Sequence, residues 1–188
     1  VGMRDRFFMI LMYDTASRCQ EMLDIKLGDF VLDGKSPYVQ LLGKGRKTRT
    51  VPLMNKTVQH LNRYLNQFHQ RNTCREDNLF YTASHGVNHQ MSPDNVEKFM
   101  MKYGRCAAQA CDEIPNRVHP HQLRHTRAIH LYRGGMPPAL LAEFLGHARL
   151  ETTKVYAYAD TEMKRNAIQK ACSKDNTIEE NVIWDQGD

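Results

Sequence analysis

Residues 119–158 read HPHQLRHTRAIHLYRGGMPPALLAEFLGHARLETTKVYAY and hold the chain's densest group of chemically active side chains. Within forty residues this stretch gathers His121, Arg124, His125, His147 and Tyr156, residue types that are suited to binding phosphate, shuttling a proton and acting as a nucleophile. The apolar residues between them predict packed helices that would hold this polar chemistry in place. These residues are Leu123, Ile129, Leu131, Leu140, Leu141, Phe144 and Leu145.

The spacing of His121 and Arg124 places both side chains on one face of a helix. A helix that begins near His121 turns its positive N-terminal dipole toward that face, which favours an anion there. An arginine fork donates two parallel hydrogen bonds to a phosphate and keeps its charge. The spacing alone is common, so it indicates phosphate binding only together with the motifs that follow it.

Three segments in this order and spacing resemble the signature motifs of the tyrosine recombinases, the phage integrase family. They are residues 121–126 (HQLRHT), residues 145–147 (LGH), and a threonine pair at 152–153 followed by Tyr156. The resemblance covers residues 4–172 and implies that Arg124 is the second of two catalytic arginines. It also implies that His121 assists proton transfer.

The first arginine of that pair is implied by the segment around Arg18. Residues 14–23 read DTASRCQEML, where the family commonly has Thr-Gly-x-Arg and a glutamate three residues later. Ala16 stands in place of the usual glycine, while Glu21 keeps the spacing. The resemblance implies that Arg18 is catalytic and that Glu21 orients it. The alternative is an ordinary surface ion pair, which contributes little to stability.

A basic hairpin is predicted at residues 43–47 (GKGRK), between strand-like residues 38–42 and 49–53. In the resembled family a lysine of this hairpin reaches the DNA and protonates the leaving oxygen, which implies that Lys44 is the general acid. An ammonium on a flexible stem is suited to that task. The alternative is a basic turn that contacts phosphates or only water. The predicted DNA contacts beside Lys44 are Arg46, Lys47 and Arg49.

Tyr156 is the nucleophile that the resemblance implies, and Tyr158 is its rival. The nine-residue separation from His147 and the preceding threonine pair favour Tyr156. His147 would donate a hydrogen bond to the scissile phosphate. A free phenol has a pKa of about 10, so nearby cations must help it lose its proton. His125 is interpreted as buried support for its helix, and not as a catalytic group.

The charge distribution indicates a polyanionic partner. The net charge is +5, but residues 173–188 carry one lysine against five acids, which leaves 25 basic and 16 acidic residues, or +9, in residues 1–172. A body this basic favours nucleic acid. The resemblance implies double-stranded DNA at a specific recombination site. The chain contains no run of 18 or more apolar residues, so the sequence predicts no membrane span.

The cysteines and histidines indicate neither a disulfide framework nor a metal site. The five cysteines are scattered without a C-x-x-C pair, which favours reduced thiols and a cytoplasmic location. His121 and His125 have the spacing of a zinc-binding helix, but the glutamate of the zincin motif is missing. We therefore expect neither a metal nor another cofactor.

The pattern along the chain predicts a mainly α-helical fold with a small antiparallel β-sheet (α+β), as in the resembled catalytic domain. Three strands, at residues 30–32, 38–42 and 49–53, would form the sheet, and residues 72–91 are expected to be irregular apart from the apolar residues 79–81. Helices are predicted over residues 4–15, 18–24, 56–71, 93–112, 121–133, 138–146, 151–158 and 161–171.

Two regions are expected: a catalytic domain over residues 1–172 and an acidic tail over residues 173–188. The tail contains apolar residues at 178 and 182–184, so it is either a frayed end or a short helix that docks on a neighbouring protomer, as in the resembled family. The family's N-terminal DNA-binding domain has no counterpart here, which suggests a fragment. The resemblance further implies a homo-oligomer (tetramer) on DNA and an accessory directionality factor.

The implied reaction is transesterification through a 3′-phosphotyrosyl intermediate, which requires no metal or ATP. The divergent surroundings of Arg18 favour integration or excision of a mobile element. Three alternatives remain: an Xer-type resolution recombinase, a type IB topoisomerase that reseals its own strand, and a non-catalytic DNA-binding relic.

Overall fold

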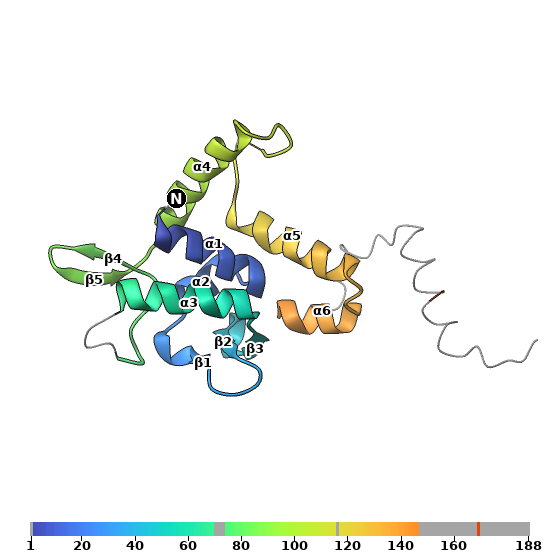
Figure 1. Cartoon of the computed structure of the whole chain (residues 1–188), viewed down its shortest axis with the longest axis horizontal. Coiled ribbons are helices and arrows are strands. Elements are labelled where there is room, and N and C mark those ends of the chain that lie inside the picture. Colours follow the sequence, from blue (N-terminus) through green and yellow to red (C-terminus); the bar gives the residue numbers. More distant parts are fainter. Residues whose placement is uncertain (1, 70–73, 116, 147–168, 170–188) are drawn as a thin grey trace, which may run out of the picture. The chain divides into compact units, whose positions relative to one another are not determined.

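The computed structural model describes residues 2–69, 74–115, 117–146 and 169, which form helices and two small antiparallel sheets (Figure 1). The helices are α1 (Met3–Thr15), α2 (Cys19–Asp24), α3 (Asn55–Phe68), α4 (Pro93–Ala108), α5 (Pro120–Arg133) and α6 (Pro138–Leu145), with 3-10 turns η1 (Leu27–Asp29) and η2 (Lys44–Arg46). The strands are β1 (Phe30–Val31), β2 (Tyr38–Leu42), β3 (Thr48–Pro52), β4 (Tyr81–Ser84) and β5 (Val87–Gln90). The predicted α+β class is confirmed.

Residues 2–146 belong to one compact unit, Val1–Tyr156. The helices predicted at residues 151–158 and 161–171 lie outside the described residues, Gln169 excepted, and so does the predicted boundary at residue 172. None of the described helices is long and apolar enough to cross a membrane.

Helix α1 lies at the centre of the core because apolar residues occur on most of its faces. It packs against both α3 and α5. Phe7 stacks on Tyr64 with ring centroids 5.0 Å apart, and Phe8 meets Phe80 edge-on at 4.9 Å. Burying each such side chain contributes roughly 1.5–3 kcal/mol to stability. The C-terminus of α1 is thereby fixed beside the loop that carries Arg18.

The predicted three-stranded sheet is present, and its strands have the order β1-β2-β3. Its inner face is set by the two-residue period of the strands, which buries Val39, Leu41 and Val51. Arg49 lies directly opposite Leu41 and two residues before Val51. The register therefore turns the Arg49 side chain toward the inner face, whereas Thr50 is exposed.

A second hairpin, β4–β5, corrects the prediction that residues 72–91 are irregular. Its strands pair from Tyr81 with Gln90 to Ser84 with Val87. Neither strand alternates clearly between apolar and polar residues, so the usual signal is missing. The turn is formed by His85 (φ 51°) and Gly86 (φ 77°), and two successive residues with positive φ are typical of a type I′ hairpin.

The helix boundaries follow most of the predicted signals. Ser92 caps α4, accepting a hydrogen bond from the Asn95 backbone N–H at 3.3 Å, but the helix ends at Ala108 and not near residue 112. Helix α3 begins at Asn55, one residue before the predicted start, and Met54 is its N-cap.

Candidate active site

Three arginines from distant parts of the chain meet at the C-terminal end of α6. Arg49 Nε donates to the Phe144 carbonyl at 3.1 Å, Arg124 Nη2 to Leu145 at 2.6 Å, and Arg18 Nη2 to Gly146 at 3.3 Å. The last carbonyls of a helix have no partner within it and form the negative end of its dipole. The three guanidinium groups therefore stabilise this helix end and are brought together by it.

Gly146 allows this close approach. It ends α6 in the left-handed conformation, with φ 62° and ψ 43°. A Cβ atom at this position would lie 3.1 Å from both Cδ and Nη1 of Arg49. The glycine of the LGH motif is thus required both by the backbone conformation and by the guanidinium packed against it.

Glu21 links two of these arginines, Arg18 and Arg49. It is 4% exposed and accepts bonds of 2.8 Å from both Nη1 and Nη2 of Arg49. Arg18 donates to it through Nη1 at 2.7 Å and through its backbone N–H at 2.8 Å. Burial alone would raise the pKa of Glu21, but the hydrogen bonds from Arg49 and Arg18 lower it to about 2. The carboxylate is therefore ionised at neutral pH.

Arg124 joins the end of α1 to the end of α6. It is 5% exposed, and its Nη1 donates to the Ala16 carbonyl while its Nη2 donates to Leu145. Ala16 ends α1 in the left-handed region, with φ 46°. That conformation costs an alanine about 1–2 kcal/mol and costs glycine almost nothing. Tight packing holds Ala16 in this conformation, since the residue is fully buried.

The predicted site residues outside the β2–β3 hairpin fall into three groups. Arg18, Glu21 and Arg124 are brought together, as described above. His121 lies exposed on the first turn of α5, and His125 is also exposed, so the prediction that His125 is buried is wrong. Other predicted residues lie outside the described part of the chain, namely His147 and Tyr156.

The basic residues of the β2–β3 hairpin differ in direction: some are exposed at its tip, and one points into the protein. Lys44 opens η2 at the tip, followed by the left-handed Gly45. Arg46 and Lys47 are exposed there, in keeping with a role in contacting DNA, which remains a prediction. Arg49, predicted to contact DNA as well, has a side chain only 11% exposed and directs its guanidinium into the protein. The sequence signal for this inward direction is the two-residue period of the strand, which places Arg49 on the same face as the apolar Val51.

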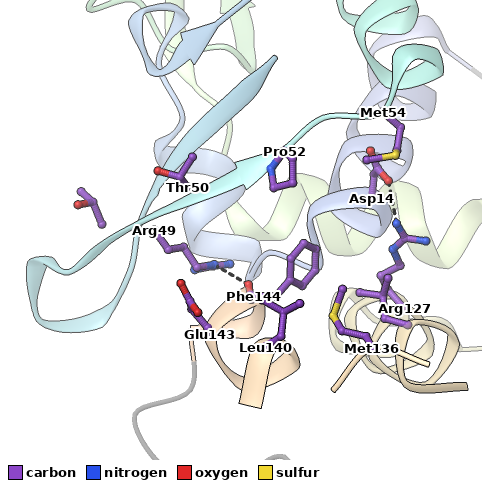
Figure 2. A pocket seen from close by; sticks show the side chains of 12 residues that line it. Asp14, Arg49, Thr50, Pro52, Met54, Arg127, Met136, Leu140, Glu143 and Phe144 are labelled. Carbon is purple, nitrogen blue, oxygen red and sulfur yellow. Dashed lines mark hydrogen bonds and ion pairs between the residues drawn. The ribbon is translucent and has the colours of Figure 1, made fainter. Parts of the chain in front are cut away.

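A cavity of about 480 Å³ lies next to this cluster, bounded by β3, α5 and α6 (Figure 2). Arg49 and Phe144 form part of its wall, and Figure 2 shows the hydrogen bond between them. Across the cavity Arg127 Nη2 contacts Asp14 at 3.0 Å. Within the described ranges, no three histidine, cysteine or acidic side chains gather closely enough to hold a metal ion.

Comparison with known proteins gives a consistent result. Residues 1–163 match the sequence profile of the phage integrase family. The tyrosine recombinase XerA of Pyrococcus horikoshii is 32% identical over 173 residues, covering 90% of this chain and 55% of that protein. XerC of Actinobacillus pleuropneumoniae is 34% identical over 161 residues, covering 84% and 48%. The chain thus spans about half the length of these relatives.

Solved structures agree. A crystal structure of XerA recombinase is similar with a TM-score of 0.70 and 26% identity, covering 90% of this chain and 57% of that one. XerH bound to its difH substrate, before cleavage, gives a TM-score of 0.67 at 25% identity, with coverage of 89% and 46%. The Tn1549 transposon integrase in complex with transposon DNA shares the fold, with a TM-score of 0.68, 17% identity and coverage of 87% and 57%.

Proposed function

This chain belongs to the phage integrase family, and we propose that it is the catalytic domain of a site-specific recombinase that cuts and rejoins DNA through Tyr156. One observation carries the proposal. Arg18 and Arg124 lie 106 residues apart in the sequence, yet they donate to the consecutive carbonyls of Leu145 and Gly146. Two guanidinium groups at adjacent acceptors can bind the two non-bridging oxygens of one phosphodiester.

The proposed reaction is a transesterification at phosphorus. The Tyr156 oxygen attacks the scissile phosphate, the bond from phosphorus to the 5′ oxygen breaks, and a 3′-phosphotyrosyl link remains. Arg18, Arg124 and His147 neutralise the charge that develops on the non-bridging oxygens, where losing one donor typically costs about 10²–10³-fold in rate. Lys44 gives its proton to the departing 5′ oxygen, and His121 assists by accepting the proton that the Tyr156 hydroxyl loses. A 5′ hydroxyl then attacks the phosphotyrosine and frees Tyr156.

The geometry supports an entry route for the phosphate. The Arg18 side chain is 34% exposed, whereas Arg124 is 5% exposed. The contact of Arg18 with the Gly146 carbonyl is 3.3 Å long, beyond the usual range for an N–H···O bond. A phosphate oxygen can replace this weak contact while Glu21 still holds the other side of the guanidinium.

Exposed cations support double-stranded DNA as the partner. Arg46 and Lys47 lie at the hairpin tip, and an exposed row on α4 contains Lys98, Lys102 and Arg105 at helical spacing. The XerH structure, which contains its difH substrate, supports the same partner. By analogy with the family we propose a homo-oligomer on DNA, a tetramer, that acts in the cytoplasm with an accessory directionality factor.

We propose integration or excision of a mobile element as the biological reaction, because the sequence around Arg18 departs from the family pattern. The fold shared with the Tn1549 integrase is compatible with it. Xer-type resolution of chromosomes or plasmids is the second candidate, and identities of 32–34% to XerA and XerC favour it. Two assays discriminate these candidates: recombination between sites on two separate replicons, and resolution of a dimeric replicon into monomers.

The proposed reaction is tested with a nicked DNA duplex that traps the cleaved state. The full-length protein first selects its binding sequence from a random duplex pool, and the selected duplex is then nicked next to each candidate scissile phosphate. In EDTA we expect a covalent protein–DNA band that disappears in Tyr156→Phe and persists in Tyr158→Phe. Loss only in Tyr158→Phe would show that the nucleophile is misassigned. Tight binding without any covalent band would favour a non-catalytic relic.

A further inference from the structure

We propose that Arg49 is a positioning residue for this reaction, which sets Arg18 through Glu21 and also fixes the turn that leads into the LGH histidine. The inference rests on the proposed function. It concerns a side chain that the sequence placed among the DNA contacts and that the structure turns inward.

The first part of the argument is the double contact with Glu21. Both terminal nitrogens of Arg49 donate to this carboxylate, one to each oxygen, at 2.8 Å. Such a bidentate pair fixes the plane and rotation of the carboxylate. Arg18 binds the same carboxylate through one terminal nitrogen and its backbone N–H. The direction of the Arg18 guanidinium therefore depends on how Arg49 holds Glu21.

The second part is the contact with α6. The remaining nitrogen of the guanidinium, Nε, donates to the Phe144 carbonyl at 3.1 Å, while Cδ and Nη1 pack against Gly146. One rigid planar group thus contacts the carboxylate that orients Arg18 and also the turn that precedes residue 147. A lysine, with a single nitrogen on a flexible stem, cannot make these contacts together.

The third part is that Arg49 is poorly placed to bind DNA. Both terminal nitrogens of Arg49 are bonded to Glu21, whose side chain is 4% exposed. A phosphate that took the Arg49 fork would leave the buried carboxylate with one partner fewer, and removing a partner from a buried ion pair is costly. The exposed Arg46 and Lys47 on the same hairpin have no such cost to overcome.

Losing Arg49 should therefore impair chemistry rather than DNA binding. Without the bidentate pair, Glu21 draws the Arg18 guanidinium into a new position, and the turn at Phe144–Gly146 loses one of its arginines. A displacement of about 1 Å in a catalytic group can reduce the rate about 10²-fold. Arg49→Met keeps the aliphatic bulk of the side chain, and Arg49→Lys keeps its charge as well.

The experiment compares single-turnover cleavage of the nicked, selected duplex with cleavage of the same duplex carrying a methylphosphonate at the scissile position. The methylphosphonate lacks the negative charge that the arginines neutralise. If Arg49 acts through the arginine pair, Arg49→Met slows cleavage of the phosphodiester about 10²-fold, and the defect shrinks to less than about 10-fold on the methylphosphonate. Arg49→Lys should show the same pattern with a folded protein.

Arg127→Met is the matched control. It also removes a partly buried arginine from a carboxylate, here Asp14 at 3.0 Å, and this pair makes no contact with Glu21 or with residues 144–146 among the described interactions. Its thermal stability should fall, while its ratio of phosphodiester to methylphosphonate rates stays that of the wild type. Filter binding at several salt concentrations accompanies each variant.

Several outcomes overturn the inference. An equal defect on both substrates would make Arg49 merely structural. Weaker binding with a salt slope shallower by about one unit would make it a phosphate contact. Wild-type cleavage by both Arg49 variants would remove any role while leaving the proposed function intact. Absence of a covalent adduct in the wild type would instead remove the proposed function, and the inference with it.

Discussion

The carboxylates of Glu21 and Asp14 are both paired with arginine, and they differ in how much positive charge surrounds them. Glu21 is shared by the guanidinium groups of Arg18 and Arg49, whereas Asp14 binds Arg127 at 3.0 Å and the Thr57 hydroxyl at 2.8 Å. Among the described ion pairs, the Glu21 cluster thus carries two cations for one anion. The Asp14 cluster is balanced.

The difference shows how similar pairs can serve different ends. The Asp14 pair joins α1 to α5 and α3, and Arg127 also stacks over the Tyr13 ring at 5.1 Å. Its interactions are completed within the protein. The Glu21 cluster leaves one positive charge in excess at a helix end, with Arg18 partly exposed. An arriving phosphate can neutralise that excess, which is the physical basis of the proposed site.

The largest expected effect compares the two carboxylates directly by amide substitution. Glu21→Gln should slow single-turnover cleavage about 10²-fold at saturating DNA, because the neutral amide no longer fixes Arg18. Asp14→Asn should leave that rate unchanged and destabilise the fold by about 1–3 kcal/mol, because it weakens a partly buried charged hydrogen bond. Rapid-quench cleavage and urea unfolding measure the two quantities. An equal rate loss in both variants would erase the distinction drawn here.

The second expected effect is a dependence of stability on pH that originates from Glu21. Its pKa is lowered from 4.5 to about 2 in the folded protein, so the unfolded chain binds the proton more readily. The stabilisation is fully present above about pH 5 and is lost as the pH falls toward 2, with a total of about 3 kcal/mol. Urea unfolding between pH 3 and 6 should show a shallower loss in Glu21→Gln than in the wild type. If the unfolding free energies of the two proteins fell in parallel with pH, the assignment of this pH dependence to Glu21 would be contradicted.

Much of the fold could be predicted because its signals are local. The helices that begin at Met3 and Pro120 follow from their apolar residues, and the three-stranded sheet follows from alternation around a basic turn. The β4–β5 hairpin has no apolar alternation, so its polar strands were missed. The exposed position of His125 also departed from the prediction, since the buried face of α5 runs through Arg124 and Ala128.

The candidate site was only partly predictable. The three-residue spacing of Arg18 and Glu21 indicated their pairing, which the structure contains. The convergence at α6 could not be foreseen, because its acceptors are backbone carbonyls that side-chain patterns do not mark. The inward direction of Arg49 was available from strand alternation, but its basic neighbours suggested an outward role.

The central claim is that Arg18 and Arg124 bind the scissile phosphate while Arg49 stays on Glu21. The most direct measurement is a crystal structure of the full-length protein with its selected DNA and orthovanadate, which copies the five-coordinate phosphorus at the cleavage point. We expect vanadate oxygens within hydrogen-bonding distance of both guanidinium groups, vanadium bonded to the Tyr156 oxygen, and the Arg49–Glu21 pair intact. Vanadate remote from Arg18 and Arg124, or Arg49 turned onto the DNA, would contradict the account.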